Sequence, residues 1–199
     1  MKYRIITIAR EFGSGGREIG RKVSEKLGLS YYDREIVLKA VEESGLSEEY
    51  IERNGEYASS LNIFSYALMG RDSSGHSVTD DLGRIQRDII RKAAEEGPCV
   101  IIGRGADYIL RDRDDVLSIF VHAEAGAKKE RIMRLYHKTE KEAADMIRDT
   151  DRKRAINHKY FTDREWGRSQ DYTMCLDSSR LGIDRCAALI CQTFKGGDQ

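Results

Sequence analysis

Near its amino terminus the chain contains a glycine-rich segment, AREFGSGGREIG at residues 9–20, with the composition of an anion-binding loop. An apolar, β-branched run at residues 3–8 precedes it, and apolar residues at helical spacing follow it. Glycines between a strand and a helix allow successive N–H groups to converge on an anion at the start of the helix. We therefore predict phosphate binding at this turn by Gly13, Ser14, Gly15, Gly16 and Arg17. An ordinary tight strand–helix turn is the alternative.

The loop departs from the standard phosphate-binding sequence G-x-x-x-x-G-K-[ST]. With Gly15 in the last glycine position, Gly16 stands at the lysine and Arg17 at the hydroxyl residue. A frame shifted by one residue places Arg17 at the lysine and Glu18 at the hydroxyl residue. Neither frame contains a lysine or a magnesium-binding hydroxyl. Arg17 is the candidate for the missing cation, because a guanidinium group binds phosphate oxygens in a bidentate way.

Two further apolar runs also end in charged residues. Residues 29–32 are followed by Asp33 and Arg34, and residues 99–102 are followed by a Gly-Arg-Gly sequence that contains Arg104. Ligands of an open α/β sheet bind beyond the carboxyl ends of its strands, so these segments should meet there. The residues predicted to surround this crevice are Arg17, Asp33, Arg34, Arg104 and Asp107. Each of them alone could equally be a surface charge, which is the commoner place for such side chains.

The elements that must position these residues alternate between strands and helices. Apolar runs predict strands at residues 3–8, 29–32, 99–102, 116–121 and 172–176, with helical patterns between them. Runs without polar alternation are typical of parallel strands buried on both faces. The sequence therefore predicts a single α/β domain, residues 1–199, with a doubly wound parallel five-stranded sheet flanked by helices. A T-x-x-E sequence at residues 139–142 predicts the start of one helix.

Composition excludes several classes of protein. The chain has 34 Lys and Arg against 34 Asp and Glu, so it lacks the basic surplus expected of a protein that binds long nucleic acid. No apolar run approaches the length of about 20 residues that spans a bilayer, and the first residues do not form a signal peptide. We expect a cytoplasmic protein whose partner is a small molecule. The sequence gives no signal of an oligomeric state.

Over nearly its whole length the chain resembles the cytidylate kinase-like family, a branch of the P-loop nucleoside monophosphate kinases. The segments that carry the resemblance are residues 6–20, 31–33 and 103–107, with looser matches at residues 151–154 and 176–179. The resemblance implies a P-loop kinase-like fold with a helical monophosphate-binding region near residues 44–79. It also implies an arginine-bearing lid, near residues 128–168.

The resemblance further implies phosphoryl transfer from ATP, with Mg²⁺, to a small phosphorylated acceptor such as the nucleoside monophosphate CMP. Asp33 is then expected to hold Mg²⁺ through water. Arg34, Arg104 and Asp107 are expected to bind the acceptor. The lid residues expected to close on the transferring group are Arg131, Arg134, Arg152 and Arg154, with Asp151 orienting one of them. The alternative for these lid residues is an exposed helix with ion pairs at i,i+3 and i,i+4 spacing.

A second function stays open because the loop lacks its lysine. A nucleotide- or phosphate-binding module that has lost catalysis would act as a sensor or would bind a partner protein. The absent lysine favours this second function, whereas the retained acidic and arginine residues favour the kinase. Likeness of fold alone does not decide between the two.

Overall fold

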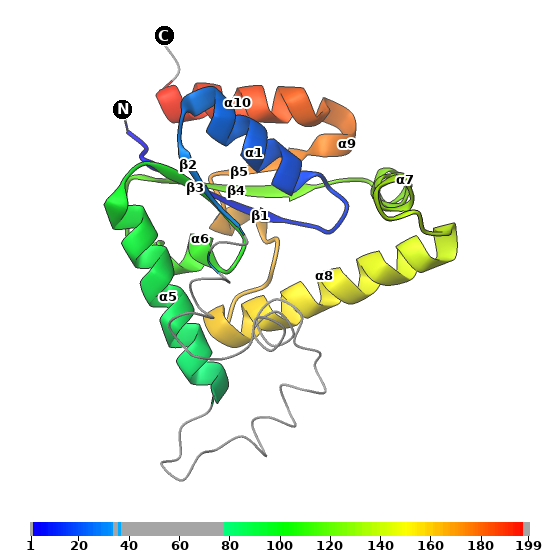
Figure 1. The fold of residues 1–199 in the computed structure, drawn as a ribbon, viewed down its shortest axis with the longest axis horizontal. Helices are drawn as coiled ribbons and strands as arrows, with labels where there is room; N and C mark the ends of the chain where they lie inside the picture. Colours follow the sequence, from blue (N-terminus) through cyan, green and yellow to red (C-terminus); the bar gives the residue numbers. More distant parts are fainter. Residues whose placement is uncertain (1, 34–35, 37–77, 197–199) are drawn as a thin grey trace.

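The structure, a computed structural model, describes residues 2–33, 36 and 78–196 (Figure 1). Arg34 and most of the predicted monophosphate-binding region, residues 44–79, therefore lie outside the described residues. The last two residues of that region begin helix α5 (Val78–Glu96).

Five parallel strands form one sheet in the order β2-β3-β1-β4-β5. The strands are β1 (Ile5–Arg10), β2 (Ser30–Tyr32), β3 (Cys99–Ile102), β4 (Val116–His122) and β5 (Met174–Asp177). Every residue of β1 and β3 is buried, as expected for apolar runs without polar alternation. The central strand β1 pairs with β3 on one side and with β4 on the other. The predicted fold class is confirmed.

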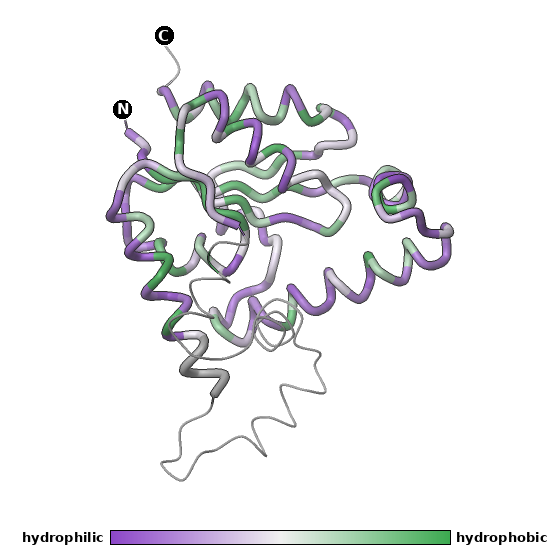
Figure 2. Tube along the Cα trace, in the orientation of Figure 1, coloured by the Kyte–Doolittle hydropathy of each residue, from purple (hydrophilic) through white to green (hydrophobic). Residues whose placement is uncertain are grey.

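Helices cover both faces of this sheet (Figure 1). On one face lie α1 (Gly16–Leu27) and α10 (Ile183–Lys195), which share a core cluster with the strands. Near β2 and β3 the other face is covered by α5 and the short α6 (Ala106–Ile109). Figure 2 shows the apolar strands between helices whose outer faces are hydrophilic. Among the described residues no helix is long and apolar enough to cross a membrane.

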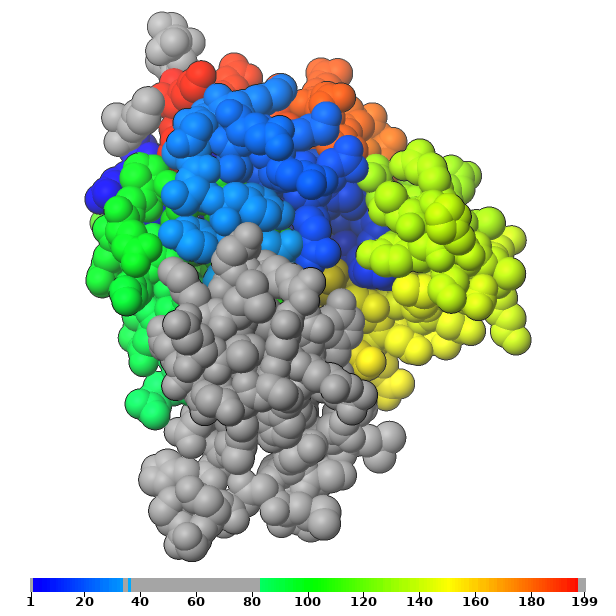
Figure 3. All heavy atoms as spheres, in the orientation of Figure 1, coloured from blue at the N-terminus to red at the C-terminus, as the bar shows by residue number. Residues whose placement is uncertain are grey.

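Two helices, α7 (Ala125–Tyr136) and α8 (Glu140–Thr162), make up most of the segment predicted to be a lid. The predicted start of α8 is present: the Thr139 hydroxyl accepts the N–H of Glu142, whose carboxylate accepts the N–H of Thr139 at 2.8 Å. In Figure 1, α8 runs from α7 across the side of the sheet that α5 and α6 also cover. Figure 3 shows α7 and α8, in yellow-green and yellow, against the dark-blue amino-terminal segment. Both helices contact the glycine-rich turn, α7 through Lys128 next to Gly13 and α8 through Asp151, which accepts the N–H of Phe12.

Candidate active site

The glycine-rich turn between β1 and α1 has the geometry of an anion-binding loop. Gly13 and Gly15 have φ angles of 81° and 80°, in the left-handed region that glycine adopts without a steric penalty. Gly15 is the N-cap of α1, whose first N–H groups lack carbonyl partners within the helix. Within the described ranges, neither glycine donates its N–H to a protein acceptor. The loop therefore offers backbone donors at the positive end of a helix dipole.

Ser14 supports the loop from inside. Its side chain is buried, and its hydroxyl donates to the carbonyl of Glu11 at 2.8 Å. The carbonyl of Ser14 accepts a hydrogen bond from the Ser178 hydroxyl at the start of α9 (Ser178–Leu181). The N–H of Ser14 also donates to the carbonyl of Glu11, at 3.3 Å. These bonds fix the shape of the turn, so Ser14 supports the loop while the neighbouring glycines supply the donors for an anion.

Arg17 lies on the β2 side of the loop and pairs with Asp33. Its Nη2 donates to Asp33 Oδ1 at 3.2 Å, and its Nε contacts Oδ2 of the same carboxylate. The Arg17 side chain is 60% exposed, whereas that of Asp33 is 11% exposed. Next to this pair, burial and the Asp33 charge raise the pKa of Tyr31 to about 12. The cation predicted for the phosphates is thus held by the carboxylate predicted for magnesium.

On the opposite side of the loop lies Lys128, a residue that sequence reasoning missed. Its Nζ is 3.0 Å from Glu11 Oε2 and 3.2 Å from Asp151 Oδ2, and its side chain is only 11% exposed. The other oxygen of Asp151 accepts the N–H of Phe12 in the loop at 2.6 Å. Lys128 precedes the buried Ile132 by four residues, which places both on one face of α7. That spacing is the signal in the sequence that points to Lys128.

Asp151 also meets one of the predicted lid arginines. The Nη1 atom of Arg154 is 3.9 Å from Asp151 Oδ1 and donates to the carbonyl of Arg10 at 3.0 Å. The guanidinium lies 5.8 Å from the centre of the Phe12 ring. Burial raises the pKa of Asp151, while Phe12 N–H, Lys128 and Arg154 oppose that rise. Arg154 is therefore the lid arginine that lies beside Asp151, the residue predicted to orient one of them.

The other predicted lid arginines lie farther out. Arg131 is 2.9 Å from the carboxylate of Glu18 and within reach of the glycine loop, because a Cβ built on Gly15 would lie 3.1 Å from its guanidinium carbon. Arg134 and Arg152 are exposed. Of the four arginines, the structure thus brings Arg131 and Arg154 to the loop.

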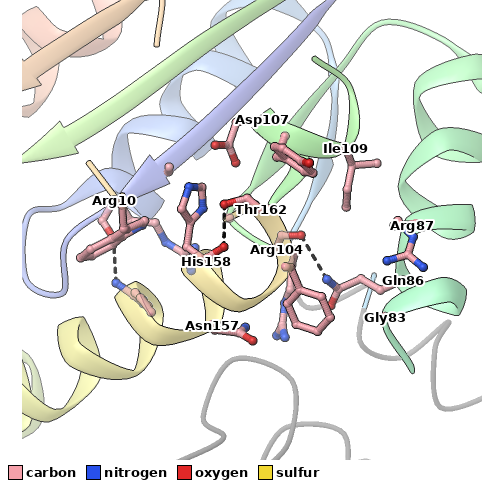
Figure 4. A pocket seen from close by; sticks show the side chains of 17 residues that line it. Arg10, Gly83, Gln86, Arg87, Arg104, Asp107, Ile109, Asn157, His158 and Thr162 are labelled. Atoms are coloured by element: carbon pink, nitrogen blue, oxygen red, sulfur yellow. Dashed lines mark hydrogen bonds between the residues drawn. The ribbon is translucent and has the colours of Figure 1, made fainter. Parts of the chain in front are cut away.

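A pocket opens at the carboxyl ends of β1 and β3, between α5, α6 and α8 (Figure 4). Its basic lining residues are Arg10, Arg87, Arg104 and Arg154. Arg104 has a φ of 59° between two glycines that are also left-handed, and its carbonyl accepts from Gln86 Nε2 at 3.1 Å. A Cβ on Gly103 would clash with Arg10 Nη1, so the Arg10 guanidinium occupies the space that this glycine leaves free. Four guanidinium groups around one cavity favour an anionic ligand.

An acid and a histidine line the sheet-facing side of the same pocket. Figure 4 shows Asp107 and His158 there, with Gln86 and Arg87 approaching from α5. Burial raises the pKa of Asp107, against the opposing effects of His158 and two backbone N–H groups. Burial also lowers the pKa of His158. Sequence reasoning predicted Asp107 at the crevice but missed His158, which follows Arg154 by four residues on the pocket side of α8.

The residues of the loop fit nucleotide phosphates better than they fit a metal ion. Gly13, Gly15 and the start of α1 supply donors for phosphate oxygens. Asp33 would have to leave Arg17 to hold Mg²⁺ through water, and the nearby Glu11, Glu18 and Asp151 are each paired with a basic side chain. The described residues include no group of three or more metal-ligating side chains. We therefore derive no step that depends on a metal held by this chain.

Comparison with known families decides the class of protein. The profile of the cytidylate kinase-like family matches residues 5–180. This chain belongs to that family. Membership supports nucleotide use and kinase-type phosphoryl transfer without naming the acceptor. No curated protein gives a match.

Solved structures place this family member among the P-loop kinase folds. An uncharacterized protein from Eubacterium ventriosum ATCC 27560 is 25% identical with a TM-score of 0.73, over 96% of this chain and 98% of that chain. Shikimate kinase from Bacteroides thetaiotaomicron is 15% identical with a TM-score of 0.55, over 96% and 98%. Shikimate kinase from Acinetobacter baumannii, in complex with shikimate, is 12% identical with a TM-score of 0.56, over 98% and 95%. The two kinases are similar to this chain in fold.

Proposed function

We propose that this protein transfers the γ-phosphoryl group of ATP, supplied with Mg²⁺, to a small phosphorylated acceptor, with nucleoside monophosphates such as CMP as the first candidates. The observation that supports this is the arginine-lined pocket beside the glycine loop. Arg154 lines this pocket and also lies near Asp151, which is hydrogen-bonded to the loop. A donor phosphate on the loop and an acceptor phosphate in the pocket would therefore share one cationic neighbour.

Each group at the site then has a defined task in the reaction. The N–H groups of Gly13 and Gly15 bind donor phosphates, and Arg10 and Arg104 bind the acceptor phosphate. Arg154 neutralises charge between the two. The bond between the γ-phosphorus and the β-phosphate oxygen breaks while an acceptor phosphate oxygen bonds to the same phosphorus, and ADP leaves. Such a reaction depends on positioning and charge neutralisation more than on covalent chemistry by the protein.

The experiment is an ADP-release assay with ATP, Mg²⁺ and a panel of nucleoside monophosphates. Arg104→Ala should raise the acceptor KM about tenfold or more, because a charge-assisted hydrogen bond to the acceptor is lost. The affinity for ATP should change less than about twofold. Arg91→Ala, an exposed arginine on α5, is the matched control and should behave like wild type. An Arg104→Ala enzyme with unchanged acceptor kinetics would contradict the assignment of the pocket.

A specific observation favours the second candidate, a catalytically inactive nucleotide sensor. Neither frame of the loop contains a lysine, and the N–H of Phe12 already donates to the carboxylate of Asp151. A sensor would bind ATP yet release no ADP with any acceptor of the panel. Isothermal titration with ATP, run beside the turnover assay, separates the two functions.

A further inference from the structure

We infer that Lys128, on α7, supplies the cation that binds the donor nucleotide's phosphates at the glycine loop, in place of the lysine that the loop lacks. The inference rests on the proposed binding of a nucleotide by that loop. It assigns the task to a residue far away in the sequence rather than to Arg17.

Lys128 is packed directly against the loop. A Cβ built on Gly13 would lie 3.0 Å from the carbonyl oxygen of Lys128 and 3.1 Å from its Cβ. Its ammonium group lies between Glu11, a residue of the loop segment, and Asp151, which is bonded to the loop at Phe12. Lys128 is therefore the buried lysine that the fold brings to the glycine turn.

The donors around Asp151 already bind an anion. One carboxylate oxygen accepts the N–H of Phe12 at 2.6 Å, and the other lies 3.2 Å from the ammonium of Lys128. A backbone N–H of a glycine-rich turn together with an ammonium group is the donor pair that a phosphate oxygen requires. A phosphate oxygen arriving at the loop can take the place of the carboxylate, which keeps Arg154 as a neighbour.

Arg17 is less suited to this task. Both cations are paired with carboxylates, Arg17 with Asp33, but the side chain of Arg17 is 60% exposed whereas that of Lys128 is 11% exposed. Water weakens the interaction of an exposed cation with phosphate, whereas a cation excluded from water acts at lower effective dielectric. Burial, and the contact of its ammonium with the loop residue Glu11, therefore both favour Lys128 over Arg17.

The test is isothermal titration of the full-length chain with Mg-ATP and with Mg-ADP. Lys128→Met should weaken binding of both nucleotides about tenfold or more, the effect of removing one charge-assisted hydrogen bond. Lys128→Arg should restore part of the affinity. The matched control is Lys129→Met, because Lys129 is adjacent in sequence but pairs with Glu140 on the surface and should bind like wild type.

A second variant protects the test against misfolding. Glu11→Gln/Lys128→Met removes one carboxylate together with the lysine and should melt closer to wild type than Lys128→Met does, yet it should bind nucleotide as weakly. Wild-type nucleotide affinity in this double variant would overturn the inference. A larger loss of nucleotide affinity in Arg17→Met than in Lys128→Met would overturn it as well. A wild-type chain that binds neither nucleotide would overturn the proposed function as well.

Discussion

The two basic residues beside the glycine loop, Arg17 and Lys128, differ in what surrounds them. Arg17 follows the glycines in sequence, yet its side chain is 60% exposed and its partner Asp33 lies at the end of β2. Lys128 is far away in the sequence, yet it is almost buried and holds two carboxylates against the loop. An exposed ion pair contributes little to stability, whereas removing one member of a buried pair leaves an uncompensated charge. Burial, not sequence proximity, therefore decides which cation matters more to the loop.

The largest effect that this comparison predicts is the loss of stability in Lys128→Met. The substitution leaves Glu11 and Asp151 without their shared cation, and the free energy of unfolding should fall by about 3–5 kcal/mol. Chemical denaturation at pH 7.5, with Lys129→Met as the control, measures the loss. A loss below about 1 kcal/mol would mean that Lys128 contributes no more to stability than a member of an exposed ion pair does.

The pH dependence of the same variant sharpens the result. In the folded wild-type protein the pKa of Asp151 is raised by burial, and Lys128 opposes that rise. A carboxyl group with a raised folded-state pKa stabilises the fold at low pH, and that contribution is lost as the pH rises through the folded-state pKa. Without Lys128 the pKa rises further, so the difference between Lys128→Met and wild type should shrink as the pH falls from 7.5 toward 5. A difference that grows toward low pH would contradict this account.

A smaller effect is expected from substituting Gly15, a glycine of the loop itself. In Gly15→Ala the alanine would have to adopt a φ of 80°, and its Cβ would clash with Ile183 Cδ1. Left-handed backbone costs an alanine about 1–2 kcal/mol, and displacing the flexible end of the Ile183 side chain adds about 1 kcal/mol. Gly105→Ala is the control, because Gly105 has a φ of 65° but nothing within 4 Å of its Cβ position. Thermal melts should show a larger drop in Tm for Gly15→Ala than for Gly105→Ala. Equal drops would mean that the loop shifts to accommodate the new methyl group.

Local sequence patterns predicted the fold because the interactions that form it are local or nonspecific. Apolar runs such as residues 99–102 became buried parallel strands, and the T-x-x-E pattern became the capping box of α8. Both depend on burial or on hydrogen bonds within a few residues of the chain. The order of the strands follows from packing of distant segments, which no local pattern contains.

The candidate site was only partly predictable for the same reason. The glycine turn and Arg104 were found because each follows directly on a strand, and the chain direction places them at the carboxyl edge of the sheet. Lys128 and His158 were missed because their positions depend on how α7 and α8 pack against that edge. A single basic residue on a helix is usually at the surface, so only its spacing from a buried residue such as Ile132 distinguishes it.

The smallest effect, and the one that completes the comparison, is expected for Arg17→Met. Arg17 is exposed, but its removal takes a cation away from the nearly buried carboxylate of Asp33, so the free energy of unfolding should fall by about 1–2 kcal/mol, less than in Lys128→Met. That small loss should decrease further between 50 mM and 500 mM salt, because exposed charges are screened more strongly at high ionic strength. Lys22→Met is the control for a pair whose carboxylate is exposed, because Asp184 is 79% exposed, and it should lose less than Arg17→Met. A loss in Arg17→Met that equals the loss in Lys128→Met and is insensitive to salt would show that Arg17 stabilises the loop as strongly as the buried lysine does.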